Sequence, residues 1–347
     1  ISGATTRGTA ENEDVYFQHT ESRNGYYIKA IDNVIYYMDK INKICKTDYK
    51  PFNYYGSATA TKVIVAMGSV CETIKETVDY LTKKGHNVGL LEVHLYRPFS
   101  AKHFLRVLPK TVKKIAVLDR TKEAGSSGEP LYLDVVNALK DRDIKIIGGR
   151  YGLSSKNTTP AMIKSVYDNL SGDMKSNFTI GINDDVTNLS LDIDNSYRLD
   201  NNNYEMLIYG YGSDGMVSTS KDILRIIGDN TKKYVQGYFQ YDSKKSGGVT
   251  RSHIRIGDTP IRSSYYVDNP NFIVVSKDSY MYKYDILDNI RGGGTLLLNT
   301  NLSSDDLIRS LPNKVKYLLA LKNVNVYTID AYKVAGEMGL KNKINTS

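Results

Sequence analysis

The chain has 347 residues, of which 41% are apolar and 24% charged, a length that predicts two or three domains rather than one. No apolar run reaches the roughly 18–20 residues that a membrane span needs. The cysteines, Cys45 and Cys71, are too few for a disulfide framework or a cysteine-rich metal site. They also exclude a [4Fe–4S] cluster held by this chain alone, because such a cluster needs about four thiolates.

The formal net charge is +8, and the basic residues are spread along the chain. This balance favours anionic ligands or an acidic partner. Because no basic stripe is interleaved with aromatic residues, we expect no nucleic acid partner. The first ten residues contain neither an initiator Met nor an apolar signal core, so we expect an internal piece of a longer protein that is not secreted.

Residues 1–58 are expected to connect a preceding domain to the rest of the chain. The first part is irregular, and a helix is then predicted over 27–44. Its apolar residues recur at helical spacing, at Ile31, Val34, Ile35, Met38 and Ile41.

Residues 59–190 alternate between strand and helix patterns and predict a first α/β domain. Such alternation indicates a parallel sheet covered on both faces. The predicted strands are 62–67, 88–96, 114–119 and 144–148, and the predicted helices are 70–81, 129–140 and 160–170.

A segment rich in Asn, Asp and Ser, residues 191–203, is the predicted linker. Residues 204–347 then repeat the α/β pattern. The fold class predicted for the chain is therefore two consecutive three-layer α/β domains with mainly parallel sheets. In the second domain, strands are predicted at 205–209, 234–241, 271–275, 295–299 and 324–329, with helices at 217–227 and from 331.

A glycine-rich loop follows the first strand of the second domain and opens a helix. Its sequence places Gly210, Gly212 and Gly215 in a G-x-G-x-x-G pattern that also contains Ser213 and Asp214. Glycines let the backbone approach a phosphate, and the helix N-terminus offers free N–H groups. The pattern predicts a phosphate-binding loop, and a tight turn without a ligand is the alternative.

A second turn, which is rich in basic residues, follows the strand 234–241. A nicotinamide site usually has an acidic residue about 20 residues beyond such a loop, a place that Asp242 could take. Lysines beside flexible backbone suit phosphate better, and the alternative is a solvated turn. The predicted phosphate contacts are Lys244, Lys245, Ser246, Gly247 and Arg251.

Residues 119–130 form a charged, glycine-containing loop between a strand and a helix. It is an interface candidate, with a solvent loop as the alternative. The carboxylate groups at 11–14 and 184–185 show no fixed partner spacing, so we interpret them as surface or capping groups. The sequence contains no nucleophile elbow, Walker sequence or zinc signature, and no catalytic residue is predicted.

Longer strings distributed over nearly the whole chain identify it further. They are Asp14-Val15-Tyr16-Phe17-Gln18, Leu95-Tyr96-Arg97-Pro98-Phe99, Ala116-Val117-Leu118-Asp119-Arg120-Thr121-Lys122-Glu123, Gly181-Ile182-Asn183-Asp184-Asp185-Val186-Thr187 and Tyr241-Asp242-Ser243-Lys244-Lys245-Ser246-Gly247-Gly248-Val249-Thr250. In these strings the chain resembles the pyruvate:ferredoxin (flavodoxin) oxidoreductase family.

The resemblance implies an enzyme that oxidises pyruvate, releases CO₂ and forms acetyl-CoA. It implies thiamine diphosphate, Mg²⁺ and [4Fe–4S] clusters in the full-length enzyme, whose binding residues lie outside this sequence. Ferredoxin or flavodoxin is the implied electron acceptor, or NADP in a reductase-fused homologue. The implied assembly is a homodimer, and the implied location is the cytoplasm, a hydrogenosome or a mitochondrion-related organelle.

The resemblance also implies that residues 59–190 are similar to the C-terminal domain of transketolase, and residues 204–347 to the gamma subunit of multi-subunit relatives. That domain is implicated in coenzyme A binding, in agreement with two phosphate-binding turns. The family pattern has Thr and Gly where this chain has Met216 and Ser218, and loss of the Thr hydroxyl would remove a phosphate contact. A nicotinamide-dependent dehydrogenase and a purely structural interdomain segment remain the alternatives.

Overall fold

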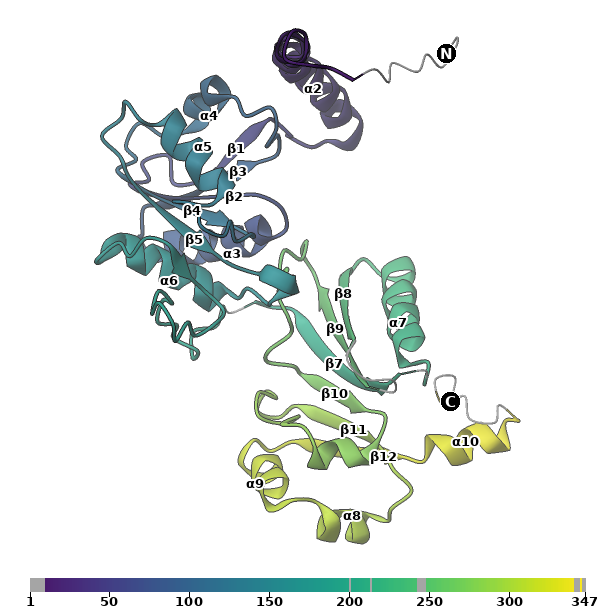
Figure 1. Ribbon diagram of the computed structural model, residues 1–347. Helices are drawn as coiled ribbons and strands as arrows, with labels where there is room; N and C mark the ends of the chain where they lie inside the picture. The colour runs from purple at the N-terminus through teal and green to yellow at the C-terminus, as the bar shows by residue number, and fades with distance from the viewer. Residues whose placement is uncertain (1–9, 200, 213, 242–247, 340–343, 345–347) are drawn as a thin grey trace, which may run out of the picture. The chain divides into compact units, whose positions relative to one another are not determined.

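The computed structural model describes residues 10–199, 201–212, 214–241, 248–339 and 344. The chain divides into two compact units, unit 1 (1–199) and unit 2 (200–347). The division falls within the predicted linker, residues 191–203. Figure 1 shows a sheet with flanking helices in each unit.

Unit 1 begins with two helices, α1 (Tyr16–Ser22) and α2 (Asn24–Cys45). The helix predicted over 27–44 is confirmed as α2, whereas α1 was not predicted. No residue of α2 is buried, so this helix contributes nothing to the core of unit 1.

Sheet A of unit 1 has six strands in the order β1-β3-β2-β4-β5-β6. All pairs are parallel except β1, which runs antiparallel to β3 at one edge. The four strands predicted from sequence are confirmed; β1 lies inside the segment expected to be a connector and was missed, as was β6. The bounds are β1 (Phe52–Gly56), β2 (Lys62–Ala66), β3 (Val88–Val93), β4 (Lys114–Asp119), β5 (Lys145–Arg150) and β6 (Phe178–Thr179).

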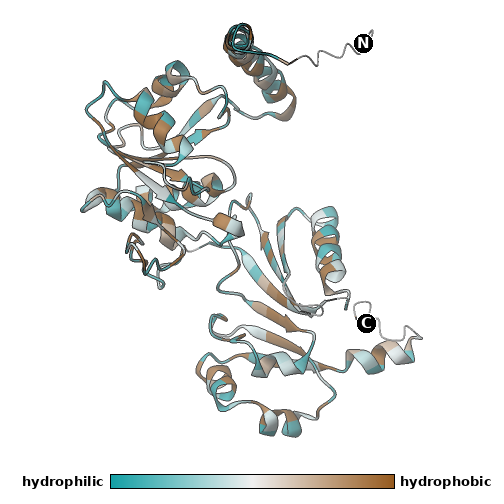
Figure 2. Cartoon of the chain, viewed as in Figure 1, coloured by the Kyte–Doolittle hydropathy of each residue, from teal (hydrophilic) through white to brown (hydrophobic). Residues whose placement is uncertain are grey.

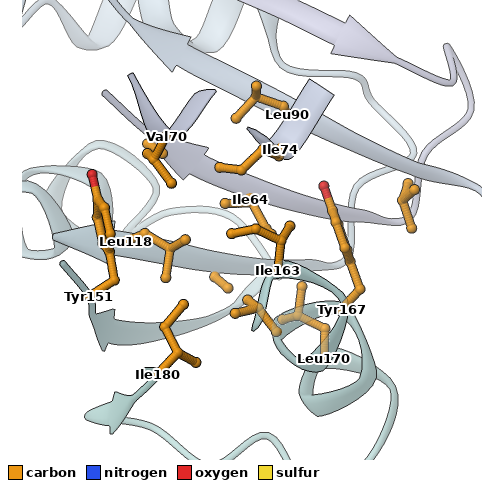
Figure 3. Packing of buried hydrophobic residues seen from close by; sticks show 14 of the residues in the cluster. Ile64, Val70, Ile74, Leu90, Leu118, Tyr151, Ile163, Tyr167, Leu170 and Ile180 are labelled. Atoms are coloured by element: carbon orange, nitrogen blue, oxygen red, sulfur yellow. The ribbon is translucent and has the colours of Figure 1, made fainter. Parts of the chain in front are cut away.

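Helices cover both faces of sheet A because successive strand residues point to opposite sides. Ile64 packs on one face with Ile163 of α6, as Figure 3 shows, and Val65 packs on the other with Phe104 of α4 and Leu131 of α5. The helices are α3 (Val70–Lys83), α4 (Ala101–Val107), α5 (Pro130–Ala138) and α6 (Pro160–Ser171), with a short 3₁₀ turn η1 (Leu153–Ser155).

Sheet B of unit 2 also has six strands, in the order β12-β11-β10-β7-β9-β8. The first four are parallel, whereas β9 is antiparallel to both β7 and β8. The sequence analysis missed β9, whose polar residues interrupt an apolar pattern. The bounds are β7 (Tyr204–Tyr211), β8 (Tyr234–Tyr241), β9 (Val249–Gly257), β10 (Phe272–Val275), β11 (Thr295–Asn299) and β12 (Asn325–Ile329).

Sheet B is likewise covered on both faces. Ile208 of β7 packs with Met216 of α7, and its neighbours Leu207 and Tyr209 pack on the opposite side with Leu307 of α8. Figure 2 shows hydrophobic residues along the strands of both sheets. The α/β fold class with two mainly parallel, three-layer units is confirmed. The helices are α7 (Met216–Asn230), η2 (Asp278–Tyr282), α8 (Ser304–Ser310), α9 (Asn313–Leu321) and α10 (Ala331–Glu337).

Candidate functional site

The glycine-rich loop lies at one edge of sheet B, next to the start of β9. Strand β7 ends where the glycine-rich loop begins, and Tyr211 pairs with Val249 at the start of β9. The amide of Gly212 donates a hydrogen bond to the carbonyl of Gly248 at 3.1 Å. The loop therefore lies beside Gly248, the residue that precedes β9. The predicted contacts Ser213, Lys244, Lys245, Ser246 and Gly247 lie outside the described residues.

Two glycines of the loop are required by its backbone. Gly215 has φ +82°, in the left-handed region, and immediately precedes α7. A Cβ atom on Gly210 would lie 2.7 Å from Thr250 Oγ1 and 2.8 Å from Met216 Cβ. Larger residues at these positions would strain the turn or displace β9. The glycines thus shape the close approach of the loop to β9 and α7.

The Asp214 carboxylate fastens the loop to its surroundings. It accepts hydrogen bonds from the backbone N–H of Tyr211 at 2.6 Å and of Met216 at 2.9 Å. It also accepts one from Ser276 Oγ, just beyond β10, at 2.7 Å. Because the negatively charged carboxylate accepts hydrogen bonds from the protein's own donors, Asp214 positions the loop and is not itself suited to contact an anion.

The departure from the family pattern at Met216 lies beneath the loop. The Met216 side chain is buried and packs with Met206, Ile208 and Ile254. The expected loss of a phosphate contact at this position is not supported, because the side chain faces the core. Ser218 is exposed in the first turn of α7.

Arg251 lies on β9 at the same edge of the sheet. Its guanidinium carbon is 5.5 Å from the ring centroids of Tyr209 and Tyr284. Its Nε atom is buried and has no hydrogen-bond partner among the described residues. A buried donor without an acceptor is costly, so an anionic group that accepts from Nε would stabilise this arrangement.

The sequence analysis missed polar residues that follow β10. Lys277 Nζ lies 5.0 Å from the Tyr211 ring centroid. The Tyr280 hydroxyl is buried without a partner in the described part of the chain, and burial raises its pKa to about 12, so it is available as a donor. Their position directly after a parallel strand is the signal that would have identified them.

The corresponding edge of sheet A is closed by its own residues. The buried Asp119 carboxylate accepts from the backbone N–H of Leu131 and Tyr132 at 3.0 and 3.1 Å. Buried Glu129 accepts from Arg150 Nη1 at 3.2 Å. The charged residues near both ends of the loop 119–130 therefore hold its conformation through hydrogen bonds within unit 1. The role of this loop as an interface stays a prediction.

In the described residues, no group of three or more His, Cys, Asp or Glu side chains could hold a metal ion. Cys45 is exposed and Cys71 is buried, and burial raises the pKa of the Cys71 thiol. No helix in the described ranges is long and apolar enough to cross a membrane.

Both units match family models. Residues 60–163 match "Pyruvate:ferredoxin oxidoreductase core domain II", and residues 205–347 match "Pyruvate ferredoxin/flavodoxin oxidoreductase". The chain is 48% identical over 345 residues to the pyruvate:ferredoxin oxidoreductase of Moorella thermoacetica. The chain belongs to the pyruvate:ferredoxin/flavodoxin oxidoreductase family. It is also 48% identical over 347 residues to the pyruvate-flavodoxin oxidoreductase of Trichormus variabilis.

Each of these alignments covers 98% of the chain but 29% of the relative. Among solved structures, the gamma subunit of a keto/oxoacid ferredoxin oxidoreductase from Geobacter sulfurreducens PCA has a TM-score of 0.32 at 17% identity, covering 42% of this chain and 70% of that one. A 2-oxoglutarate:ferredoxin oxidoreductase from Magnetococcus marinus, with 2-oxoglutarate, coenzyme A and succinyl-CoA bound, has a TM-score of 0.32 at 15% identity, covering 42% and 23%. Likenesses of this size carry no argument about function.

Proposed function

We propose that this chain is part of an enzyme that oxidatively decarboxylates pyruvate to acetyl-CoA and passes electrons to ferredoxin or flavodoxin. Within that enzyme, unit 2 binds coenzyme A at the edge of sheet B where the glycine-rich loop lies beside the start of β9. Family membership supports the reaction, because the named relatives align over nearly the whole chain.

One observation carries the coenzyme A proposal. The hydrogen bond between Gly212 and Gly248 places the glycine-rich loop beside the residue that follows the predicted contacts Lys244–Gly247 in the sequence. Coenzyme A carries a pyrophosphate and a 3′-phosphate, so it needs more than one cationic or N–H-rich group. The glycine-rich loop and the N-terminus of α7 suit the pyrophosphate, and the connection that contains Lys244 and Lys245 suits the second phosphate.

The charges of the described residues agree with an anionic ligand. Arg251 brings a cation whose buried Nε has no partner among the described residues, and Lys277 brings an exposed ammonium group. The Tyr280 hydroxyl adds a protonated donor. Together they favour a phosphate-bearing ligand over a neutral one.

Thiamine diphosphate, Mg²⁺ and the [4Fe–4S] clusters are assigned to other parts of the enzyme. The chain has two cysteines, fewer than the four thiolates of a cluster, so its residues alone cannot hold a [4Fe–4S] cluster. In this proposal the chain supplies a coenzyme A site and part of the scaffold, and its partners are the remaining domains of a homodimeric enzyme.

Isothermal titration calorimetry of the chain with coenzyme A tests the site. We expect a Kd on the order of 1 μM to 1 mM and weaker binding of 3′-dephospho-coenzyme A. A Lys244→Ala/Lys245→Ala variant should lose binding. A Lys232→Ala/Lys233→Ala variant removes the same charge just before Tyr234, at the opposite end of β8, and should keep it.

Two results would count against the proposal. Absence of heat at millimolar coenzyme A would favour a purely structural role for this chain. Competition by NADH with an affinity that survives the Lys244→Ala/Lys245→Ala substitution would favour a nicotinamide site at the glycine-rich loop.

A further inference from the structure

Helix α2 has an apolar face that unit 1 does not bury. On a helix of 3.6 residues per turn, residues three, four and seven apart share a face. The polar side chains Lys29, Asn33 and Lys40 occupy the opposite side. The apolar face consists of Ile28, Ile31, Val34, Ile35, Met38, Ile41 and Cys45, and polar Asn42 interrupts it near its end.

The apolar face is exposed towards its ends, and its central residues Ile31, Val34, Ile35 and Met38 are partly buried. None of the 22 residues of α2 is buried. Ile28 is 69% exposed and Ile41 is 48% exposed, and they lie near opposite ends of the face. A contiguous apolar surface of this kind marks an interaction site. Helices also depend mainly on such packing, rather than on intrinsic propensity, for their stability in water.

The comparisons indicate what covers this face. Helix α2 lies outside both family-model matches, which span 60–163 and 205–347. Two relatives nevertheless align with 98% of the chain. The residues left unaligned are fewer than the 22 residues of α2, so the alignments include at least part of this helix. The helix therefore has a counterpart in longer proteins, of which this chain covers 29%.

We propose that the apolar face of α2 packs against a domain of the same full-length polypeptide other than the two units described here. The charges on the rest of the helix fit this assignment. Lysines such as Lys29 and Lys40 are interspersed with Asp32 and Asp39, whereas a membrane-surface helix has a strongly basic polar face. The proposal rests on family membership and is independent of the coenzyme A site.

Cys45 provides a natural probe of this docking. It ends α2 on the same face as Met38 and Ile31, at spacings of seven residues, and it is exposed. The other thiol, Cys71, is buried. A thiol reagent applied to this chain therefore reports on the end of α2.

The experiment compares Cys45 alkylation by iodoacetamide in the full-length enzyme and in the 347-residue chain, followed by peptide mass spectrometry. We expect alkylation about tenfold slower or more in the full-length enzyme, because burial excludes the reagent. In that enzyme, Ile35→Asp on the apolar face should restore fast alkylation. The matched control Asn33→Asp introduces the same charge on the polar face and should leave Cys45 protected.

If Ile35→Asp yields no folded enzyme, Met38→Ala replaces it and should accelerate alkylation to a smaller extent. Equal rates in the full-length enzyme and the chain would overturn the proposal. So would protection within the isolated chain that rises with its concentration, since the occupant would then be a second copy. Protection of the isolated chain by anionic phospholipid vesicles would identify a membrane surface instead and would overturn it as well.

Discussion

The two units differ in whether the polar side chains at the carboxyl edge of the sheet have hydrogen-bond partners. At the edge of sheet A, the Asp119 and Glu129 carboxylates are satisfied by backbone N–H groups and by Arg150. At the edge of sheet B, Arg251 Nε and the Tyr280 hydroxyl are buried without partners among the described residues. The same architecture thus builds a closed loop in one unit and leaves donors available for a ligand in the other.

A second difference lies in the sheets themselves. The central strands of sheet A are almost fully buried and apolar. In sheet B, β9 carries Arg251, His253 and Arg255 on one face, because alternate residues of a strand point the same way. The stability of unit 2 should therefore respond to removal of the buried Arg255 charge and to protonation of His253.

The largest expected effect is on the buried ion pair of unit 2. Arg255 Nε lies 2.7 Å from Glu205 Oε1, with side-chain exposures of 3% and 5%. Arg255 also donates to the carbonyls of Tyr265 and Tyr266. Replacement Arg255→Met leaves the Glu205 charge buried and should lower the free energy of unfolding of unit 2 by about 3–5 kcal/mol.

Amide hydrogen exchange of β9, read with β2–β4 as an internal reference, measures this loss for one unit at a time. The control is Lys233→Met, which removes the exposed pair with Asp258 and should cost about 0–1 kcal/mol. Equal losses for the two variants would mean that the buried pair is not a special feature of unit 2.

The second effect is a dependence of unit 2 on pH. Burial, reinforced by Arg255 and Arg251, lowers the pKa of His253 to about 3, against about 6.5 in the unfolded chain. The unfolded state therefore binds more protons between these values. Stability present above pH 6.5 should fall by about 1.4 kcal/mol per pH unit as pH drops toward 3.

Hydrogen exchange of β9 from pH 7 to pH 4.5, corrected for the intrinsic exchange rate, tests this slope. Since His253 Nδ1 accepts from the Val267 amide, His253→Asn keeps an acceptor without a titrating ring and should flatten the profile. His103→Asn in unit 1 should leave the profile of β9 unchanged. A slope that persists in His253→Asn would assign the effect to other groups.

Much of the fold follows from local sequence patterns, and the misses share a cause. Buried parallel strands such as β2 and β4 are continuous apolar runs, so they were predicted. Strands β1 and β9 were missed because their residues are aromatic or polar, and their strand state depends on antiparallel pairing with β3 and β7. Such pairing is a property of the folded sheet and leaves little signal within the strand itself.

The candidate site was likewise predictable only where it has a local sequence pattern. The glycine-rich loop has a local pattern, and its context between a strand and a helix is confirmed. The proximity of Gly212 to Gly248 depends on β9 and could not be predicted without it. Lys277 and Tyr280 belong to the same edge only because β10 lies beside β7. Contacts of the loop with Lys244 and Lys245 stay a prediction.

The third effect concerns the closed edge of unit 1. Asp119→Ala removes the acceptor for two N–H groups in the first turn of α5. This change should destabilise unit 1 by about 2 kcal/mol, seen as faster hydrogen exchange in β4. Calorimetry should show unchanged coenzyme A binding. A loss of binding in this variant would show that the two edges are not functionally separate.

The smallest expected effect concerns Arg251, at the carboxyl edge of sheet B. Arg251→Met removes a cation whose Nε has no partner in the described residues, so the free energy of unfolding of unit 2 should stay the same or rise. Coenzyme A affinity should fall about fivefold, equivalent to about 1 kcal/mol. Calorimetry and hydrogen exchange on one sample separate the two quantities. If Arg251→Met destabilises β9 and leaves coenzyme A affinity intact, the arginine is structural, and the open edge of sheet B resembles the closed edge of sheet A after all.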